Sequence, residues 1–306
     1  WGLAVYLTLL CACAVYGASL GPVSSLLAFS YPPYAMLEQI QTAPEAYAPP
    51  PEPAAEGVRI QADTEGEAQP AMQVGAQDAP RILIYHTHAT EAYLPTKDDP
   101  YEPSGTARTR DETKNVVAVG ERLKELLESE YGLTVLHDRE NYEPPRLSTA
   151  YSRSLIGMER YRREYPSIEI FIDVHRDAYG SGATEPKDYV ELDGRQAARL
   201  MFVVGMGEGA TGAGFDEMPD FESNRALAER ITARLRSTNE QLVRPVRVKT
   251  GRYNQHVSDQ CLLVEVGHNA NTLAQAMNAL PYLAEAVAAC IDDLTGLSGQ
   301  AVWAPQ

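Results

Sequence analysis

Three short apolar runs in this chain each lead to a side chain that can bind a metal ion or a proton. They are residues 82–85 before His88, residues 168–174 before His175, and residues 261–264 before Glu265. Runs of this length, rich in Ile, Val, Leu and Phe, predict buried strands, and the carboxyl ends of neighbouring parallel strands meet at one crevice. Burying several ionisable groups there is costly unless they are paired or bind a metal. The three runs therefore predict a metal-dependent hydrolase site on an α/β fold.

Strand-like and helix-like segments alternate beyond Arg81. Helices are predicted over residues 115–127, 148–161, 224–235 and 271–294. Further strands are predicted over residues 133–136, 200–204 and 246–248, with a hairpin at 189–195. Pro281 should kink or divide the last helix. This alternation predicts a three-layer α/β domain over residues 81–295, with a largely parallel central sheet flanked by helices.

The first part of the chain has a different composition. Residues 1–37 carry no charged side chain, and Trp1–Leu20 is apolar and long enough to span a bilayer, so we expect a signal anchor. The positive flank that usually accompanies such an anchor is missing, since the first basic residue is Arg59. Residues 38–80 are rich in Pro, Ala, Glu and Gly and cannot bury enough apolar surface to offset their ordering entropy. They predict a disordered tether, and residues 296–306 form a tail.

Charge and cysteine content exclude some functions. The formal net charge of −16 argues against nucleic acid or an anionic membrane face as the main partner, because no basic stripe could neutralise phosphates. Cys261 and Cys290 fall in a predicted strand and a predicted helix, where a free cysteine acts as a small buried hydrophobe. The sequence has no CxxC pair, which excludes a cysteine zinc site.

Several motifs together resemble the stage II sporulation protein P family. They are His-Thr-His-Ala-Thr-Glu-Ala-Tyr at 86–93, Tyr-Ser-Arg-Ser at 151–154, Asp-Val-His-Arg-Asp at 173–177, and Leu-Val-Glu-Val-Gly at 263–267 followed by Asn271-Thr272. The resemblance implies a membrane-anchored peptidoglycan hydrolase of endospore-forming bacteria, related to the zinc-dependent N-acetylmuramoyl-L-alanine amidases, with an amidase-like fold.

The same resemblance implies a place of action and partners. The chain would be a single-pass protein of the cell membrane, with its catalytic domain outside the cytoplasm, between the mother-cell and forespore membranes during engulfment. Its substrate would be peptidoglycan, cut at the N-acetylmuramoyl-L-alanine amide and also at stem-peptide crosslinks. Stage II sporulation proteins D and M would be its membrane partners.

The wider amidase family suggests roles for individual residues. In that family a His at the end of the first strand and a His at the end of a later strand bind zinc, and a Glu on the last strand is the base. By position, His88 and His175 would be zinc ligands and Glu265 the catalytic base. The third ligand is left open between Asp111, near a helix start where the amidases have a longer Glu, and Glu91, three residues after His88. We favour Glu91, because Asp111 follows a long loop that is rich in proline.

Five further residues are candidates for contacting substrate. His86 lies two residues before His88 and would share its face in a strand, or it orients a ligand by a hydrogen bond. Arg176 and Asp177 would bind carboxylates of the peptide or pair with each other. Asn254 and His256 precede the strand of Glu265 in a loop that could line the cleft.

Two functions of different class follow from the sequence. The first is a zinc hydrolase of peptidoglycan. The second is a metal-free peptidoglycan-binding scaffold that recruits another wall hydrolase. The presence of His88, His175 and Glu265 together favours the enzyme, since a scaffold has no physical need for all three.

Overall fold

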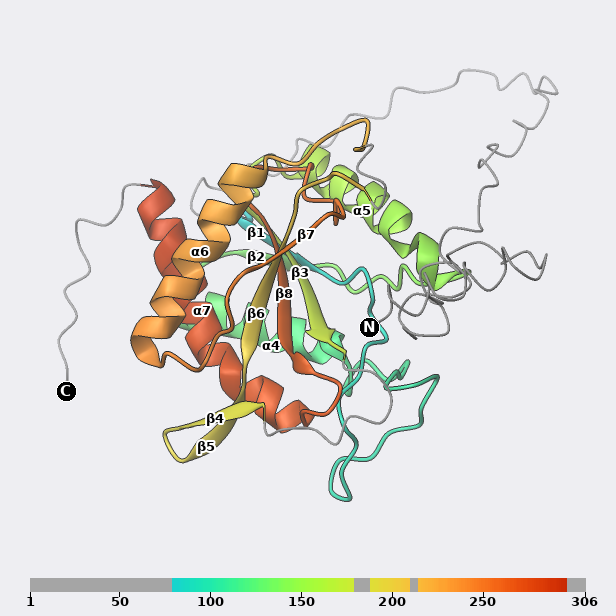
Figure 1. Cartoon of the computed structure of the whole chain (residues 1–306), viewed down its shortest axis with the longest axis vertical. Helices are drawn as coiled ribbons and strands as arrows, with labels where there is room; N and C mark the ends of the chain where they lie inside the picture. The colour runs from blue at the N-terminus through green and yellow to red at the C-terminus, as the bar shows by residue number, and fades with distance from the viewer. Residues whose placement is uncertain (1–78, 179–187, 210–213, 296–306) are drawn as a thin grey trace, which may run out of the picture. The chain divides into compact units, whose positions relative to one another are not determined.

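The computed structural model describes residues 79–178, 188–209 and 214–295 (Figure 1). The predicted anchor at 1–37, nearly all of the predicted tether and the tail at 296–306 lie outside the described residues. None of the helices in the described ranges is both long and apolar enough to cross a membrane. The predicted domain limits therefore stay predictions, and the fold below concerns the folded part alone.

A six-stranded mixed sheet forms the centre of the domain. The order across the sheet is β2 (Val135–His137), β1 (Ile82–Tyr85), β3 (Ile170–Asp177), β8 (Cys261–His268), β6 (Leu200–Gly205) and β7 (Arg247–Lys249). The first four of these strands run parallel, β6 runs antiparallel to β8, and β7 runs parallel to β6. The predicted largely parallel sheet is thus confirmed, with two reversed strands at one edge.

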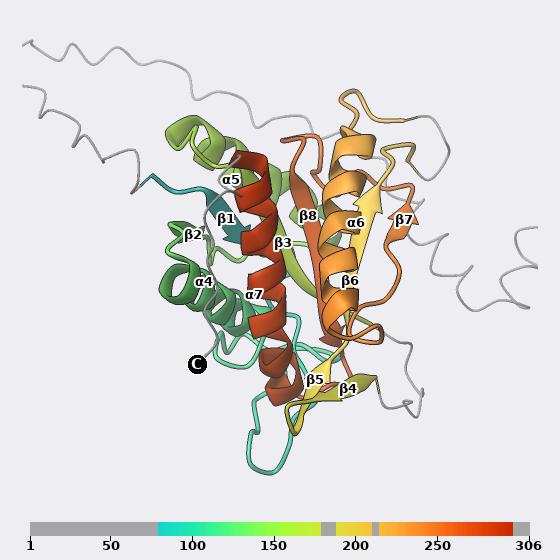
Figure 2. The same cartoon turned by 90° about the vertical axis from the view of Figure 1, so that its left-hand side faces the viewer.

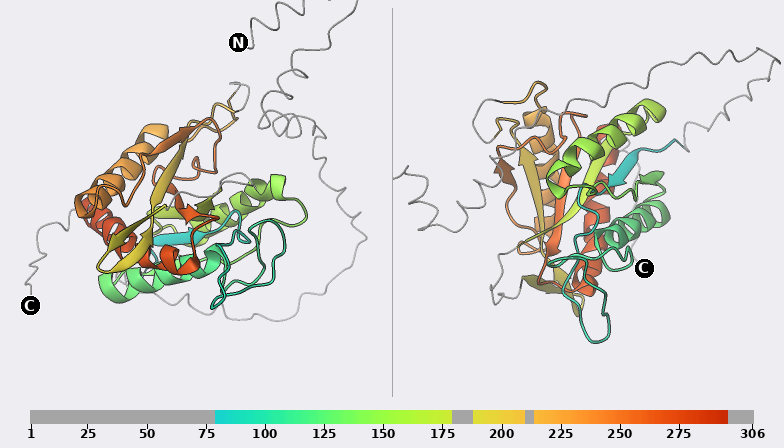
Figure 3. Two further views of the ribbon diagram at one scale, coloured as in Figure 1. Left: turned by 60° about the horizontal axis from the view of Figure 1, so that its bottom comes forward. Right: turned by 90° about the vertical axis from the view of Figure 1, so that its right-hand side faces the viewer.

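Helices cover both faces of the sheet, which gives the three predicted layers (Figures 2 and 3). Three of them pack on one face and one lies on the other. The first group is α4 (Val116–Tyr131), α6 (Phe221–Thr238) and α7 (Leu273–Thr295), and the single helix is α5 (Ala150–Glu164), which follows the short 3-10 turn Leu147–Thr149. A small hairpin of β4 (Tyr189–Leu192) and β5 (Arg195–Ala198) leads into β6.

The alternation of side chains along the strands separates two cores. In β1, Ile82 and Ile84 point into the large core beneath α4, α6 and α7, whereas Leu83 and Tyr85 pack with Met158 of α5. Because the side-chain period of a strand is two residues, the same alternation continues in β3 and β8. The candidate site lies on the face of the sheet that α5 covers, at the carboxyl ends of β1, β3 and β8.

Helix ends and the cysteines follow the sequence rules. Asn115 caps α4 by accepting a hydrogen bond from the Val117 amide, and Gly132 ends the helix at φ 63°, a conformation that glycine adopts readily. Cys261 and Cys290 are both buried in the cores, as predicted. Pro281 lies inside α7, which is not divided there.

Candidate active site

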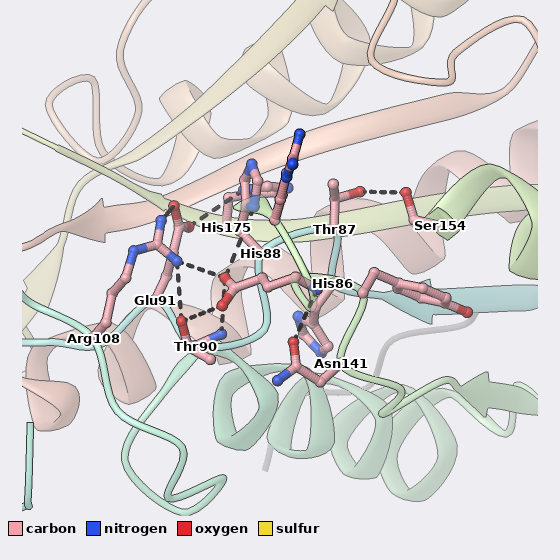
Figure 4. A network of polar contacts seen from close by, with 12 residues as sticks. His86, Thr87, His88, Thr90, Glu91, Arg108, Asn141, Ser154 and His175 are labelled. Atoms are coloured by element: carbon pink, nitrogen blue, oxygen red, sulfur yellow. Dashed lines mark hydrogen bonds and ion pairs between the residues drawn. The ribbon is translucent and has the colours of Figure 1, made fainter. Parts of the chain in front are cut away.

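Three strand ends bring His88, His175 and Glu265 to one place, as the sequence predicts. His175 of β3 and Glu265 of β8 are direct partners in the parallel register, so their side chains share the face that α5 covers. His88 follows the end of β1, and its ring lies against that of His175 with centroids 5.4 Å apart and planes at 87° (Figure 4). A sheet edge thus holds two imidazoles and a carboxylate together.

Of the two candidates for a third ligand, the structure brings Glu91 to these histidines. The Glu91 carboxylate lies 3.3 Å from Nδ1 of His175, and it also accepts a hydrogen bond of 3.2 Å from the Arg176 amide. Asp111 is on the surface, where its carboxylate accepts from the amide and hydroxyl of Thr113 at 3.0 and 2.7 Å. The structure thus places Glu91, and not Asp111, beside His175, while the Asp111 carboxylate stabilises a turn.

His175 lies between two buried carboxylates. Its Nδ1 faces Glu91, and its Nε2 lies 2.9 Å from Oδ1 of Asp173, although this contact is not aligned as a hydrogen bond. Burial lowers the pKa of His175, but the negative charge of Asp173, together with that of Glu91, outweighs burial and raises it well above its usual value. Burial raises the pKa of Asp173, yet His175 and Thr87 together hold it below its usual value. His175 therefore carries a proton that balances these carboxylates.

His88 is in the opposite protonation state. Burial, with the positive charge of His175 as a second cause, lowers its pKa to about 4, so the ring is neutral at pH 7. Its Nδ1 is buried and has no hydrogen-bond partner among the described residues; the nearest carboxylate, that of Glu143, lies 3.8 Å away. A neutral imidazole with a buried, unpaired nitrogen can bind a metal ion through that atom.

Glu265 is a carboxyl group whose affinity for protons suits acid–base chemistry. Burial raises its pKa to about 7, against the opposing effect of His175. Its Oε2 is buried without a hydrogen-bond partner in the described part of the chain. A group with a pKa near the working pH can both accept and return a proton.

An arginine and a third glutamate also belong to the site, and the sequence interpretation missed both. Arg108 comes from the long loop after β1, and its Nη1 contacts Glu143 at 2.5 Å and donates to the Thr90 hydroxyl at 3.0 Å, while its Nη2 lies 3.5 Å from Glu91 (Figure 4). The Thr90 hydroxyl also donates to Glu143 at 2.5 Å. The only signal in the sequence was the Thr-Glu pair of the 86–93 motif, which supplies two of these partners.

These side chains are of the types that bind a divalent cation, but they are not arranged around one metal position. In the described residues no group of three or more His, Cys, Asp or Glu side chains is arranged to hold a metal ion. However, His88 offers an unpaired nitrogen, Glu91 lies beside His175, and Asp173 adds a further buried negative charge. Imidazole and carboxylate are the ligands that zinc takes in catalytic sites. A cation would take the place of the proton on His175.

His86 does not reach the site, so the prediction that it shares a face with His88 is wrong. Strand β1 ends at Tyr85, and the ring of His86 turns toward α4, fully buried. Its Nδ1 lies 3.0 Å from the Val174 carbonyl oxygen and its Nε2 lies 2.8 Å from Nε2 of His137. Burial is the main cause that lowers its pKa to about 3. His86 thus contacts the backbone of Val174, the residue before His175, from the opposite face of the sheet.

Arg176 and Asp177 likewise have structural partners. The guanidinium of Arg176 donates to the backbone carbonyls of Ala92 at 2.9 Å and Ala107 at 2.7 Å, which ties down the loop that carries Arg108. Asp177 forms ion pairs with Arg244 at 3.4 Å and with Arg247 at 3.8 Å. The two side chains do not pair with each other, and the buried Arg176 is not placed to bind a substrate carboxylate.

Asn254 and His256 lie on the loop before β8, and only the first is linked to the site. Asn254 donates to the Tyr151 carbonyl at 2.7 Å and to the Ser154 hydroxyl at 3.0 Å. The Ser154 hydroxyl contacts that of Thr87, which donates to Asp173. His256 has a buried side chain whose Nε2 lies 3.7 Å from the exposed carboxylate of Glu217. Asn254 therefore belongs to a chain of polar contacts that ends at His175.

The fold and the site define a three-layer α/β protein with a buried histidine–carboxylate site at the ends of its parallel strands. Residues 28–288 match the family described as Stage II sporulation protein P. The chain therefore belongs to the stage II sporulation protein P family, and the resemblance in its motifs is confirmed.

Known relatives agree with this assignment. The chain is 28% identical over 234 residues to Stage II sporulation protein P of Bacillus subtilis (strain 168). The aligned region covers 72% of this chain and 54% of that protein. It thus spans about half the length of that curated relative.

Two solved structures are similar at low identity. The N-acetylmuramoyl-L-alanine amidase AmiC2 of Nostoc punctiforme shares 15% identity at a TM-score of 0.41, covering 72% of this chain and 97% of that one. The N-acetylmuramoyl-L-alanine amidase of Clostridium difficile 630 shares 14% at a TM-score of 0.42, covering 73% and 100%.

Proposed function

We propose that this chain is a zinc-dependent peptidoglycan hydrolase that cleaves the amide between the lactyl group of N-acetylmuramic acid and L-alanine during sporulation. The observation that carries the proposal is the meeting of His88, His175, Glu91 and Glu265 at three strand ends. Family membership supports action on peptidoglycan in sporulation. We further propose that it works from the membrane, outside the cytoplasm, alongside stage II sporulation proteins D and M.

In the proposed site His88, His175 and Glu91 would hold zinc. An amide is a poor electrophile, and zinc at this position would polarise its carbonyl and acidify a water molecule. Asp173 accepts two hydrogen bonds from Thr87 and faces His175, so it fixes the orientation of that imidazole. Arg108 holds Glu91 and Glu143 in place from the loop side.

Glu265 supplies the proton transfer. With a pKa of about 7, its carboxylate can take a proton from the attacking water at Oε2 and then give it to the leaving amine of L-alanine. General acid–base catalysis of this kind contributes roughly 10²–10⁴-fold to the rate. The rigid strand β8 holds Glu265 one strand away from His175, so both groups act on the same face.

The test measures the zinc content of each variant and the muropeptides that it releases. His88→Ala and His175→Ala should each lose most bound zinc and all activity, because one of three protein ligands is lost. His88→Ala should keep the fold, whereas His175→Ala should also lower the free energy of unfolding, since Glu91 and Asp173 lose their positive neighbour. Glu265→Gln should keep zinc and lose most turnover, measured by mass spectrometry of muropeptides released from purified peptidoglycan. Asp111→Asn is the matched control for Glu91→Gln, and only the second should release zinc. Full zinc occupancy in both histidine variants would refute the ligand assignment.

The metal-free scaffold is the second candidate, and one observation favours it. No three ligand side chains in the described part of the chain are arranged around a common point. A scaffold would bind peptidoglycan equally well with and without a chelator, and Glu265→Gln would bind and act as the wild-type chain does. If the wild-type chain releases muropeptide fragments and a chelator stops this release, the chain is the enzyme and not the scaffold.

A further inference from the structure

A cavity of about 340 Å³ lies beside the candidate site and plays no part in the chemistry described so far. Three aromatic rings line it, with a polar or charged group between them. Its main lining residues are Tyr151, Ser152 and Leu155 from α5, and Phe215, Arg252 and Tyr253 from the loops before α6 and β8. Binding pockets of small ligands are typically apolar hollows of this size with a few polar groups.

One ring connects the cavity to the site. Tyr151 packs edge-on against His88 on one side, with ring centroids 5.6 Å apart, and against Tyr253 on the other, also at 5.6 Å. A group bound in the cavity is therefore separated from His88 by a single tyrosine ring. In the proposed reaction, the part of the substrate adjoining the scissile amide would lie at this distance.

The aromatic wall is built on a strained backbone. Tyr253 and Asn254 have φ values of 50° and 55°, a region that residues with side chains rarely adopt. The Asn254 amide holds this turn to α5 through its bonds to Tyr151 and Ser154, and a Cβ on Gly251 would lie 2.7 Å from the Tyr253 ring. Backbone strain of this kind persists only where surrounding contacts enforce it, and it concentrates at functional sites.

Charge at the rim adds a polar anchor. The Arg252 guanidinium stacks over the Phe215 ring at 4.8 Å, and its Nη1 donates to the Glu217 carbonyl at 3.3 Å. A guanidinium has five N–H donors, so this arginine can hold further oxygen atoms while the ring fixes its plane. The cavity thus offers flat apolar faces with a hydrogen-bond donor at the edge.

We propose that this cavity is the subsite for the N-acetylated aminosugar ring next to the scissile amide. The proposal rests on the proposed amidase function and names which part of the substrate binds here. A sugar ring has apolar C–H faces and a polar rim, which match rigid aromatic walls and an arginine at the edge. A peptide would instead need backbone hydrogen-bonding groups along an extended groove, and the lining supplies aromatic faces instead.

The experiment compares two substrates that share the scissile amide. One is a muramyl peptide, and the other is the D-lactyl peptide with the same amino acids and no sugar. Phe215→Ala and Arg252→Gln should each lower kcat/KM for the muramyl peptide roughly tenfold, the effect of one lost pocket contact, and leave the lactyl peptide within about twofold. Phe215 is 41% exposed, so removing its ring opens no core.

Ile156→Ala is the matched control, because Ile156 is an apolar residue of α5, 65% exposed, that does not line the cavity. Equal losses on both substrates would mean that the cavity binds the peptide part, and no loss on either would mean that it binds nothing in the reaction; both overturn the proposal. Calorimetric binding of the muramyl peptide to Glu265→Gln, with and without Phe215→Ala, gives a readout that needs no turnover. If the wild-type chain cleaves neither substrate, the proposed function fails, while this binding arm still decides on the subsite.

Discussion

Asp173→Asn tests the electrostatic account of the site in the metal-free protein. Asp173 is 1% exposed and accepts hydrogen bonds from the Thr87 amide at 2.9 Å and the Thr87 hydroxyl at 2.7 Å, while His175 lies 2.9 Å away. Asparagine keeps one oxygen for Thr87 but removes the charge. The proton on His175 then loses one of its two carboxylates.

The expected loss of stability is large. A hydrogen bond to a charged group contributes about 1.5–3 kcal/mol, and breaking a buried ion pair from one side costs about 3–5 kcal/mol in total. One bond of Thr87 and the ion pair are lost together, so we expect a fall of about 3–5 kcal/mol in the free energy of unfolding. Urea denaturation of the chelated protein measures it. Asp98→Asn, an exposed carboxylate, is the control and should change stability by less than about 0.5 kcal/mol.

The difference between wild type and Asp173→Asn should depend on pH. The folded-state pKa of Asp173 lies below its unfolded value, so its contribution is present above about pH 3.9 and is lost as pH falls through the folded pKa. The folded-state pKa of His175 is raised, so its contribution is complete below about pH 6.5 and is lost as pH rises through the folded pKa. The difference should therefore be largest between about pH 4 and 6.5. A difference that stays below about 1 kcal/mol in this range, or that does not fall at lower and higher pH, would refute the reasoning.

Three further predictions concern the surroundings of the site. Gly120→Ala should lower the free energy of unfolding by about 1–3 kcal/mol in urea denaturation, because the new Cβ would lie 2.6 Å from Nε2 of His86. His86 should contribute up to about 1.4 kcal/mol per pH unit to the fall in wild-type stability below pH 6.5, since the unfolded chain binds a proton at His86 and the folded chain, with a pKa of about 3 there, does not; His86→Gln should reduce the slope by this contribution. Arg108→Gln should lower kcat on muropeptides at least tenfold while circular dichroism is unchanged, because Glu143 and Glu91 lose the cation that positions them; unchanged kcat would contradict this role.

The fold was largely predictable because local patterns and tertiary packing agree. Apolar runs of strand length and helical spacing of apolar residues predicted each element, and the structure differs mainly at the ends. Asp193 and Gly194 form the predicted hairpin turn at φ 49° and 72°. The reversal of β6 was not predictable, because the hairpin β4–β5 turns the chain before β6 and nothing in the β6 sequence fixes its direction.

The site was predictable where it lies on strands or directly after the end of β1. His175 and Glu265 follow from strand register, and His88 from the end of β1. Arg108 and Glu143 come from loops whose course depends on contacts that are distant in sequence, such as Arg176 to the Ala107 carbonyl. His86 was misplaced because the strand period no longer applies after Tyr85.

The charge balance at His175 explains how this site can be folded before a metal binds. Glu91 and Asp173 are buried carboxylates, and leaving them without a positive neighbour would cost several kcal/mol. In the metal-free protein Arg108 lies beside Glu91, and the raised pKa of His175 favours a proton between Glu91 and Asp173. A zinc ion bound by His88, His175 and Glu91 in the proposed function would displace this proton and supply positive charge, two units in place of one. The carboxylates therefore keep a cationic partner in both states, and zinc binding should release a proton and weaken as the pH falls.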